Sequence, residues 1–142
     1  MRNTILLIFS LILISCNKRE KGDNKQNATI YMEFDTYLEA QNIPKCEDTC
    51  YYIILPASCI TCKPWLSSDK FKDTKKLHLI TANPKRYFTN FISVFEDPES
   101  NFMDLSFNKF GPLLVQVITS KQECSAEQIN TISQLKKVIP NF

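Results

Sequence analysis

The chain has 142 residues, of which 44% are hydrophobic, and it carries 17 Lys and Arg against 15 Asp and Glu, for a formal net charge of +2. The basic residues do not gather into one patch, which argues against nucleic acid as a partner. The length is enough for one small domain, and no internal repeat is visible.

The first residues have the pattern of an export signal. Arg2 precedes the apolar run 5–14, which is too short to cross a bilayer but has the length of a signal-peptide core. The run closes with Ser15 and Cys16, which resembles the bacterial lipoprotein signal, where cleavage precedes a cysteine that then receives a lipid. This resemblance implies a signal peptide over residues 1–15 and a lipid on Cys16. The alternative is an ordinary signal peptide cut nearby, with Cys16 incidental.

Residues 17–29 contain no large apolar side chain, which predicts that residues 16–29 form a lipidated, disordered tether. The domain is then expected over residues 30–142. Removal of the signal takes away Arg2, so the mature chain has 16 basic and 15 acidic residues and a net charge of +1. The stretch after Cys16 lacks the acidic run that resembles a surface-export signal. We therefore expect a lipid-anchored protein of the bacterial cell envelope that faces the periplasm.

Hydrophobic periodicity predicts the elements of the domain in chain order. Apolar residues at helical spacing predict a helix over residues 30–41, and Pro44 marks its end. The continuous apolar run 51–55 predicts a buried strand. A helix is expected over residues 62–72, a strand over 77–82 and a short helix over 84–91.

The second half of the domain continues the alternation. Residues 92–97 are a possible strand, residues 98–110 are a helix or a loop, and residues 112–119 are a strong strand. The last predicted element is a helix in which Ile129, Ile132, Leu135 and Ile139 share a face, with a capping box at Ser125 and Gln128 and an end at Pro140. Strands that alternate with helices predict an α/β fold with helices packed on a central mixed sheet.

Two cysteines, Cys59 and Cys62, lie where the first strand gives way to a helix. A buried strand followed by Cys-x-x-Cys at the start of a helix resembles the thioredoxin fold. The segment around Pro112 resembles the thioredoxin segment in which a cis-proline begins an antiparallel strand beside the cysteines. The whole resembles thioredoxin-like lipoproteins of Bacteroidetes-type bacteria, with a helix added before the first strand.

This resemblance implies a membrane-tethered thiol–disulfide oxidoreductase that acts on protein thiols or disulfides, with no cofactor. A helix N-terminus favours the thiolate form, so Cys59 is the expected nucleophile and Cys62 the resolving thiol. Pro112 would be the cis-proline that shapes the substrate groove. The chain departs from the family at Ile53, where thioredoxins often have a buried aspartate. The alternative from another class is a redox-inert binding or scaffold lipoprotein in which Cys59 and Cys62 form a structural disulfide.

Metal and haem sites fit the pattern less well. A zinc site would need Cys46 and Cys50 as further ligands, but the extended residues 51–56 span about 20 Å and separate the two cysteine pairs. A c-type haem site would need a histidine after Cys62, where Lys63 stands, and the only histidine, His78, lies inside a predicted strand. We therefore expect no metal ligands among these residues.

Three further cysteines, Cys46, Cys50 and Cys124, are expected at the opposite end of the sheet from Cys59. In a thioredoxin-like sheet the strand after Pro112 runs antiparallel to the first strand, and Cys124 follows that strand after a short turn. This predicts a structural disulfide between Cys124 and either Cys46 or Cys50. A local bond between Cys46 and Cys50, with Cys124 free, is the competing arrangement.

Overall fold

The structure is a computed structural model that describes residues 25–56, 66, 71, 74–84, 91, 93–108, 111–140 and 142. Predictions about the signal peptide, Cys16, the helix over 62–72 and the helix over 84–91 fall wholly or mostly outside these residues. Among the described residues, no helix has the length and apolar character that crossing a membrane requires.

Five strands form one mixed sheet in the order β3-β2-β1-β4-β5. The strands are β1 (Thr49–Leu55), β2 (Leu77–Thr81), β3 (Ser93–Glu96), β4 (Leu113–Ile118) and β5 (Glu123–Gln128). The pairs β1–β2 and β2–β3 are parallel, whereas β1–β4 and β4–β5 are antiparallel. The prediction of an α/β fold around a mixed sheet is thus confirmed, and so is the antiparallel direction of the strand after Pro112.

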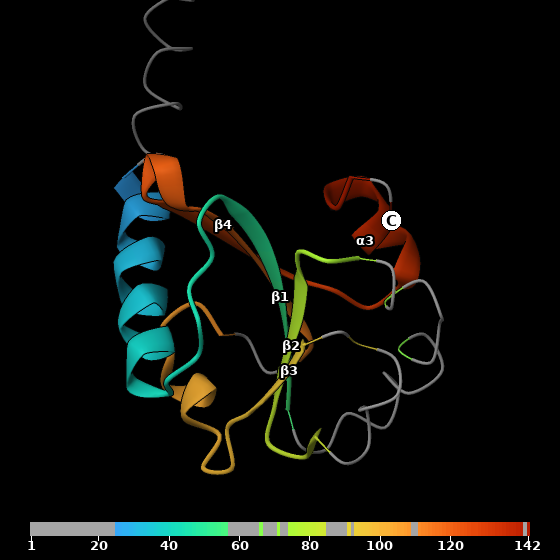
Figure 1. Ribbon diagram of the computed structural model, residues 1–142, viewed down its shortest axis with the longest axis horizontal. Coiled ribbons are helices and arrows are strands. Elements are labelled where there is room, and N and C mark those ends of the chain that lie inside the picture. Colours follow the sequence, from blue (N-terminus) through green and yellow to red (C-terminus); the bar gives the residue numbers. More distant parts are fainter. Residues whose placement is uncertain are drawn as a thin grey trace, which may run out of the picture.

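Each face of the sheet is covered by a helix (Figure 1). The N-terminal helix, residues 25–40, packs on one face, and α3 (Ile132–Val138) packs on the other. β1 lies between the two cores, so its residues alternate between them: Tyr52 and Ile54 face the N-terminal helix, while Ile53 and Leu55 face α3. A strand buried on both faces requires a continuous apolar run, which is why periodicity identified β1.

The N-terminal helix is already helical at residue 25, so residues 25–29 are not part of a disordered tether as predicted. Its C-terminal end is a Schellman motif, in which the N–H of Ile43 donates to the carbonyl of Leu38 and that of Asn42 to Glu39. Asn42 has the left-handed φ of 53° that this motif needs. The helix therefore ends through Asn42, two residues before Pro44.

The last part of the chain differs from the prediction. Residues 123–128 form β5 rather than the first turns of a helix, and α3 begins only after Thr131. The capping box consists of Thr131 and Gln134, and the Gln134 side chain accepts a hydrogen bond of 3.0 Å from the Thr131 N–H. Cys124 and Ala126 point into the core whereas Ser125 and Glu127 are exposed, the alternation of an edge strand. Ile129 is buried in the connection that leads into α3.

Candidate functional site

The candidate site is the edge of the sheet where the parallel strands β1, β2 and β3 end. In such sheets ligand and catalytic groups gather at the carboxyl ends of the strands. The only buried polar or charged residues of the described core, Thr81 at the end of β2 and Asp97 directly after β3, lie at this edge. β4 begins at the same edge, because Leu113 pairs with Ile54 near the end of β1.

Asp97 organises this edge through three hydrogen bonds to its carboxylate. Tyr37 Oη donates to Oδ2 at 3.0 Å, the Phe102 N–H donates to Oδ2 at 2.9 Å, and Asn101 Nδ2 donates to Oδ1 at 3.0 Å. The Asp97 N–H in turn donates to the carbonyl of Thr81 at 3.1 Å. These bonds join the N-terminal helix, β2 and the short 3₁₀ helix η3 (Asn101–Asp104) at one buried carboxylate.

Burial of the Tyr37 ring raises the pKa of its hydroxyl far above its ordinary value, and the negative charge of Asp97 adds to the effect. Tyr37 is therefore a hydrogen-bond donor across the physiological pH range. In the sequence, Tyr37 is one of the apolar residues of the predicted helix over 30–41 and Asp97 ends the possible strand over 92–97, and neither was predicted as a site residue. The available signal was an acidic residue at the end of a predicted strand, at the edge where polar groups gather in α/β sheets.

Pro112 lies at this edge, but its peptide bond is trans. None of the described peptide bonds is cis, and the bond between Gly111 and Pro112 is among them, so the predicted cis-proline is wrong. Pro112 is buried, and its carbonyl accepts a hydrogen bond of 2.9 Å from the N–H of Ile129. This bond continues the pairing of β4 with β5 and fixes the start of β4 without a cis bond.

Gly111 leaves room for a side chain from the neighbouring strand. The Gln128 side chain lies over Gly111 so closely that a Cβ atom at this position would clash with Gln128 Nε2. Gln128 is the last residue of β5 and pairs with Leu113. The beginning of β4 is thus packed against the end of β5 by an amide group at the candidate edge.

The two cysteines of the Cys-x-x-Cys motif, Cys59 and Cys62, lie outside the described residues. The structure shows where the chain leaves the sheet toward these cysteines. β1 ends at Leu55, and Cys59 follows four residues later in the sequence. The chain therefore departs toward the dithiol from the edge that carries Thr81, Asp97 and Pro112.

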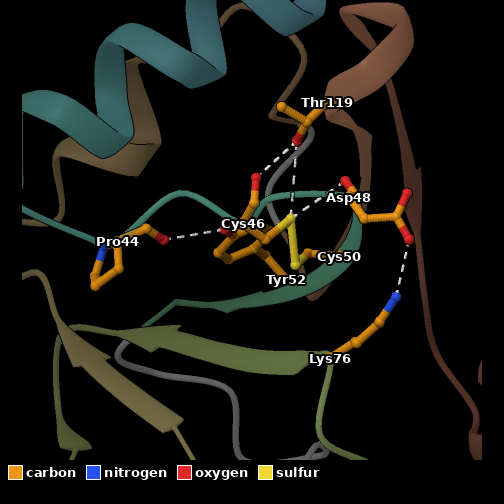
Figure 2. Close-up of a disulfide and its surroundings, with 7 residues drawn as sticks. All are labelled: Pro44, Cys46, Asp48, Cys50, Tyr52, Lys76 and Thr119. Carbon is orange, nitrogen blue, oxygen red and sulfur yellow. Dashed lines mark hydrogen bonds and ion pairs between the residues drawn. A yellow bond between two sulfur atoms is a disulfide. The ribbon is translucent and has the colours of Figure 1, made fainter.

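The opposite end of the sheet carries a disulfide between Cys46 and Cys50, with a Cα–Cα distance of 6.2 Å (Figure 2). Thr119 Oγ1 donates to the carbonyl of Cys46 at 2.9 Å and lies 3.9 Å from its sulfur. Asp48, between the two cysteines, forms an ion pair of 3.0 Å with Lys76. The disulfide closes the loop that enters β1. The contacts with Lys76 and Thr119 hold this loop against the start of β2 and the turn after β4. Since both sulfurs bond to each other, they are not available as zinc thiolates.

Cys124 is free and buried, so the predicted bridge from Cys124 to Cys46 or Cys50 is wrong and the competing local bond is found. The register explains the error. Cys50 and Cys124 both pair with Val117, from opposite sides of β4. They lie at the same end of the sheet, as predicted, and share a row and a face, but one strand lies between them. Two strand spacings separate their Cα atoms by about 10 Å, beyond the ~7 Å that a disulfide tolerates.

His78 lies on the face covered by the N-terminal helix, with its ring centroid 5.1 Å from that of Tyr52 and 5.9 Å from that of Phe95. Its Nδ1 is buried without a hydrogen-bond partner, and burial lowers the pKa of the imidazole. No cluster of three His, Cys, Asp or Glu side chains suited to a metal ion occurs within the described part of the chain.

No protein-family model, curated protein or solved structure matches the chain. The function of the candidate edge therefore has to be argued from its own chemistry.

Proposed function

We propose that the protein is a membrane-tethered thiol–disulfide oxidoreductase of the cell envelope that uses Cys59 and Cys62. The observation that carries the proposal is the state of the other cysteines of the domain. Cys46 and Cys50 are bonded to each other, and Cys124 is buried and free. Burial raises the pKa of the Cys124 thiol to about 12, which suppresses its reactive thiolate. Cys59 and Cys62 are then the pair left for exchange.

The arrangement of the sheet supports a thioredoxin-like fold as part of this proposal. A Cys-x-x-Cys motif follows the end of a central strand, and an antiparallel strand, β4, begins beside that end. The trans bond at Pro112 and the buried Ile53 are departures from that family. They remove the cis-proline and the buried acid from the machinery of exchange, so the dithiol itself has to supply the chemistry.

The proposed reaction is a two-electron exchange. The Cys59 thiolate attacks one sulfur of a substrate disulfide, which forms a mixed disulfide and releases one substrate thiolate. The Cys62 thiolate then attacks Cys59, which closes the Cys59–Cys62 disulfide and releases the second substrate thiolate. The substrate is reduced and the dithiol oxidised, and a partner thiol or disulfide restores the starting state. The same steps in reverse oxidise a substrate dithiol.

The decisive measurement is the pH dependence of Cys59 alkylation, read by mass spectrometry in the otherwise native protein. The proposal expects a half-point clearly below about 8.5, the value of an unperturbed thiol. Cys59→Ser should abolish exchange with a protein disulfide, and Cys124→Ser is the matched control that should leave it intact. A half-point at or above that of a free thiol would instead favour the second candidate, a redox-inert binding or scaffold module with a structural Cys59–Cys62 bond.

A redox titration in glutathione or dithiothreitol buffers gives the direction of catalysis. Known dithiol catalysts range from about −270 mV for reductants to about −120 mV for oxidants. A Cys59–Cys62 bond that resists reduction far below that range would also favour the inert module.

The tether is a separate part of the proposal. Processing that is sensitive to globomycin, together with a lipid mass on Cys16, is the expected result. A mature protein that starts at another residue and carries no lipid would remove the membrane anchor from the proposal without affecting the dithiol.

A further inference from the structure

A cavity of about 620 Å³ opens at the end of the sheet opposite the candidate edge, on the face covered by α3. Its wall comes from the loop that enters β1, the start of β1, the turn before β2, the middle of β4 and the residues that follow α3. The lining residues are Asp48, Thr49, Tyr51, Thr74, Lys75, Lys76, Gln116, Ile139 and Pro140. The volume is in the range of small-molecule sites, roughly 300–1,000 Å³.

A tyrosine hydroxyl lines the cavity, and its hydrogen is not used by any of the described residues. Tyr51 is only 5% exposed, and within the described part of the chain the one polar contact of its hydroxyl is Gln116 Nε2, which donates to Tyr51 Oη at 3.5 Å. Among the described residues nothing accepts the hydrogen of the Tyr51 hydroxyl. A hydroxyl hydrogen that the described residues leave unused on a cavity wall is available to an acceptor oxygen of a ligand. Gln116 keeps a second amide hydrogen for the same purpose.

The charges of the lining point to an anion. Among the described residues of the wall, Asp48 is the only carboxylate, and it is paired with Lys76 at 3.0 Å. No carboxylate in the described part of the chain pairs with Lys75. The described lining, with two lysines and one aspartate, thus carries a net positive charge. The neutral donors Tyr51 and Gln116 together with the Lys75 ammonium balance the charge of a monoanion better than that of a phosphate dianion.

We propose that this cavity binds a small organic monocarboxylate. The carboxylate accepts hydrogen bonds from Tyr51 Oη and Gln116 Nε2 and lies beside the Lys75 ammonium, while the apolar part of the ligand packs against Ile139 and Pro140. Asp48 and Thr49 lie between Cys46 and Cys50, so the disulfide holds one wall of the cavity in place. The site is independent of the thiol chemistry proposed for Cys59 and Cys62.

The test uses the full chain, purified in detergent, with benzoate as the probe. Titration followed by amide chemical shifts should give saturable binding below about 10 mM, with the largest shifts at residues 49, 51, 75 and 116. Tyr51→Phe removes only the hydroxyl and should weaken binding ~10-fold or more, the effect of losing a hydrogen bond to a charged group. Lys75→Gln should weaken it by a similar factor.

Two matched variants control for general effects. Tyr31→Phe removes a tyrosine hydroxyl from the N-terminal helix, and Lys137→Gln removes an exposed lysine from α3; neither residue lines the cavity, and both variants should bind benzoate like the unchanged protein. Near-ultraviolet circular dichroism verifies that each variant is folded. The proposal is overturned by absence of saturable binding in the folded protein, by benzoate binding that survives Tyr51→Phe and Lys75→Gln together, or by inorganic phosphate binding more tightly than benzoate.

Discussion

At the scale of single residues, the most informative side chain is Cys124. The residue is 1% exposed, and burial raises the pKa of its thiol from 9.0 to about 12. At pH 8 only about one molecule in 10⁴ then carries the thiolate. We expect iodoacetamide to leave Cys124 unmodified in the native protein at pH 8 and to modify it rapidly in guanidinium chloride. Rapid native modification, detected by peptide mass spectrometry, would contradict its burial.

Burial of the same thiol makes the free energy of unfolding decrease at alkaline pH. Because the folded-state pKa is raised, the stabilising contribution is fully present below pH 9 and is lost as the pH rises toward 12. The urea midpoint should therefore fall over this interval. Cys124→Val keeps an apolar side chain and removes the titration, so its midpoint should fall less steeply. The residual decline should begin near pH 10, where Tyr37 and Tyr52 ionise in the unfolded chain while burial keeps both protonated in the folded protein.

Asp97 and Tyr37 give a second prediction at this scale. Tyr37→Phe deletes one donor to the buried carboxylate and should lower the free energy of unfolding by about 1–2 kcal/mol. Asp97→Ala leaves Tyr37, Asn101 and the Phe102 N–H without their acceptor and should cost about 2–4 kcal/mol. Asp104→Ala, at an exposed position in η3, is the matched control and should change stability by less than about 0.5 kcal/mol in urea denaturation.

At the scale of elements, the end of the N-terminal helix depends on one backbone conformation. Asn42 has a φ of 53°, which β-branched residues adopt only with strain. Asn42→Val should lower the free energy of unfolding by about 1–2 kcal/mol, whereas Asn42→Gly should cause no loss because glycine is preferred at this position of a Schellman motif. Gln41→Val, at a neighbouring position without a positive φ, provides the comparison in urea denaturation. Equal losses for both valine variants would argue against the motif.

The loop before β1 carries the second prediction for an element. Closure of the short loop between Cys46 and Cys50 is worth about 2 kcal/mol in the chain-entropy account. The double variant Cys46→Ala and Cys50→Ala should therefore be less stable by about that amount in urea denaturation. Exchange at Cys59 and Cys62 should continue, because this loop is at the other end of β1. Loss of exchange in a variant shown to be folded would place the Cys46–Cys50 bond in the reaction and contradict a structural role.

Elements whose burial is complete could be predicted from the sequence, while those that depend on pairing could not. Leu77, Leu79 and Ile80 in β2 and Leu113 to Val115 in β4 form apolar runs that only buried strands explain. β5 contains Glu123, Ser125 and Glu127 on its exposed side, and its hydrogen bonds come from β4 rather than from local preference. Ser125 and Gln128 imitate a capping box, which favoured the wrong element.

At the candidate edge, too, some features could be predicted from the sequence and others could not. The place where the chain leaves β1 toward Cys59 followed from the order of elements, but the role of Asp97 depends on Tyr37, 60 residues earlier in the chain. The cysteine pairing depended on register, since Val117 lies between Cys50 and Cys124. A cis bond was wrongly predicted at Pro112, where the peptide bond is trans, because the expectation came from a family resemblance and not from the local sequence.

At the scale of the whole molecule, the two ends of the sheet have different chemical characters. One end carries Asp97, Thr81 and the start of the chain toward Cys59, and the other carries the Cys46–Cys50 bond, Lys76 and the cavity beside Tyr51. β1 runs from one end to the other over seven residues, about 23 Å at ~3.3 Å per residue. Ligand binding at the cavity is therefore expected to leave the alkylation half-point of Cys59 unchanged.

The N-terminal helix lies along the same direction as β1 and connects these two ends. Its first turn is near the turn between β4 and β5, because Asn27 lines a small cavity with Ile118 and Glu123. Further along, Tyr37 reaches Asp97. Residues 25–40 at 1.5 Å each give the helix a length of about 24 Å. If the lipid is on Cys16 and the proposed function holds, the helix acts as a spacer that directs the candidate edge toward the aqueous compartment, within reach of soluble proteins.

This orientation can be measured in vesicles that contain nitroxide-labelled lipids. In a background of Cys59→Ser and Cys62→Ser, a fluorophore attached through Lys121→Cys, beside the β4–β5 turn, should be quenched strongly. The same fluorophore attached through Asp104→Cys, near the candidate edge, should be quenched weakly. Equal quenching at the two positions would mean that the domain lies flat on the bilayer, and the reach of the dithiol would then be confined to partners within the membrane surface.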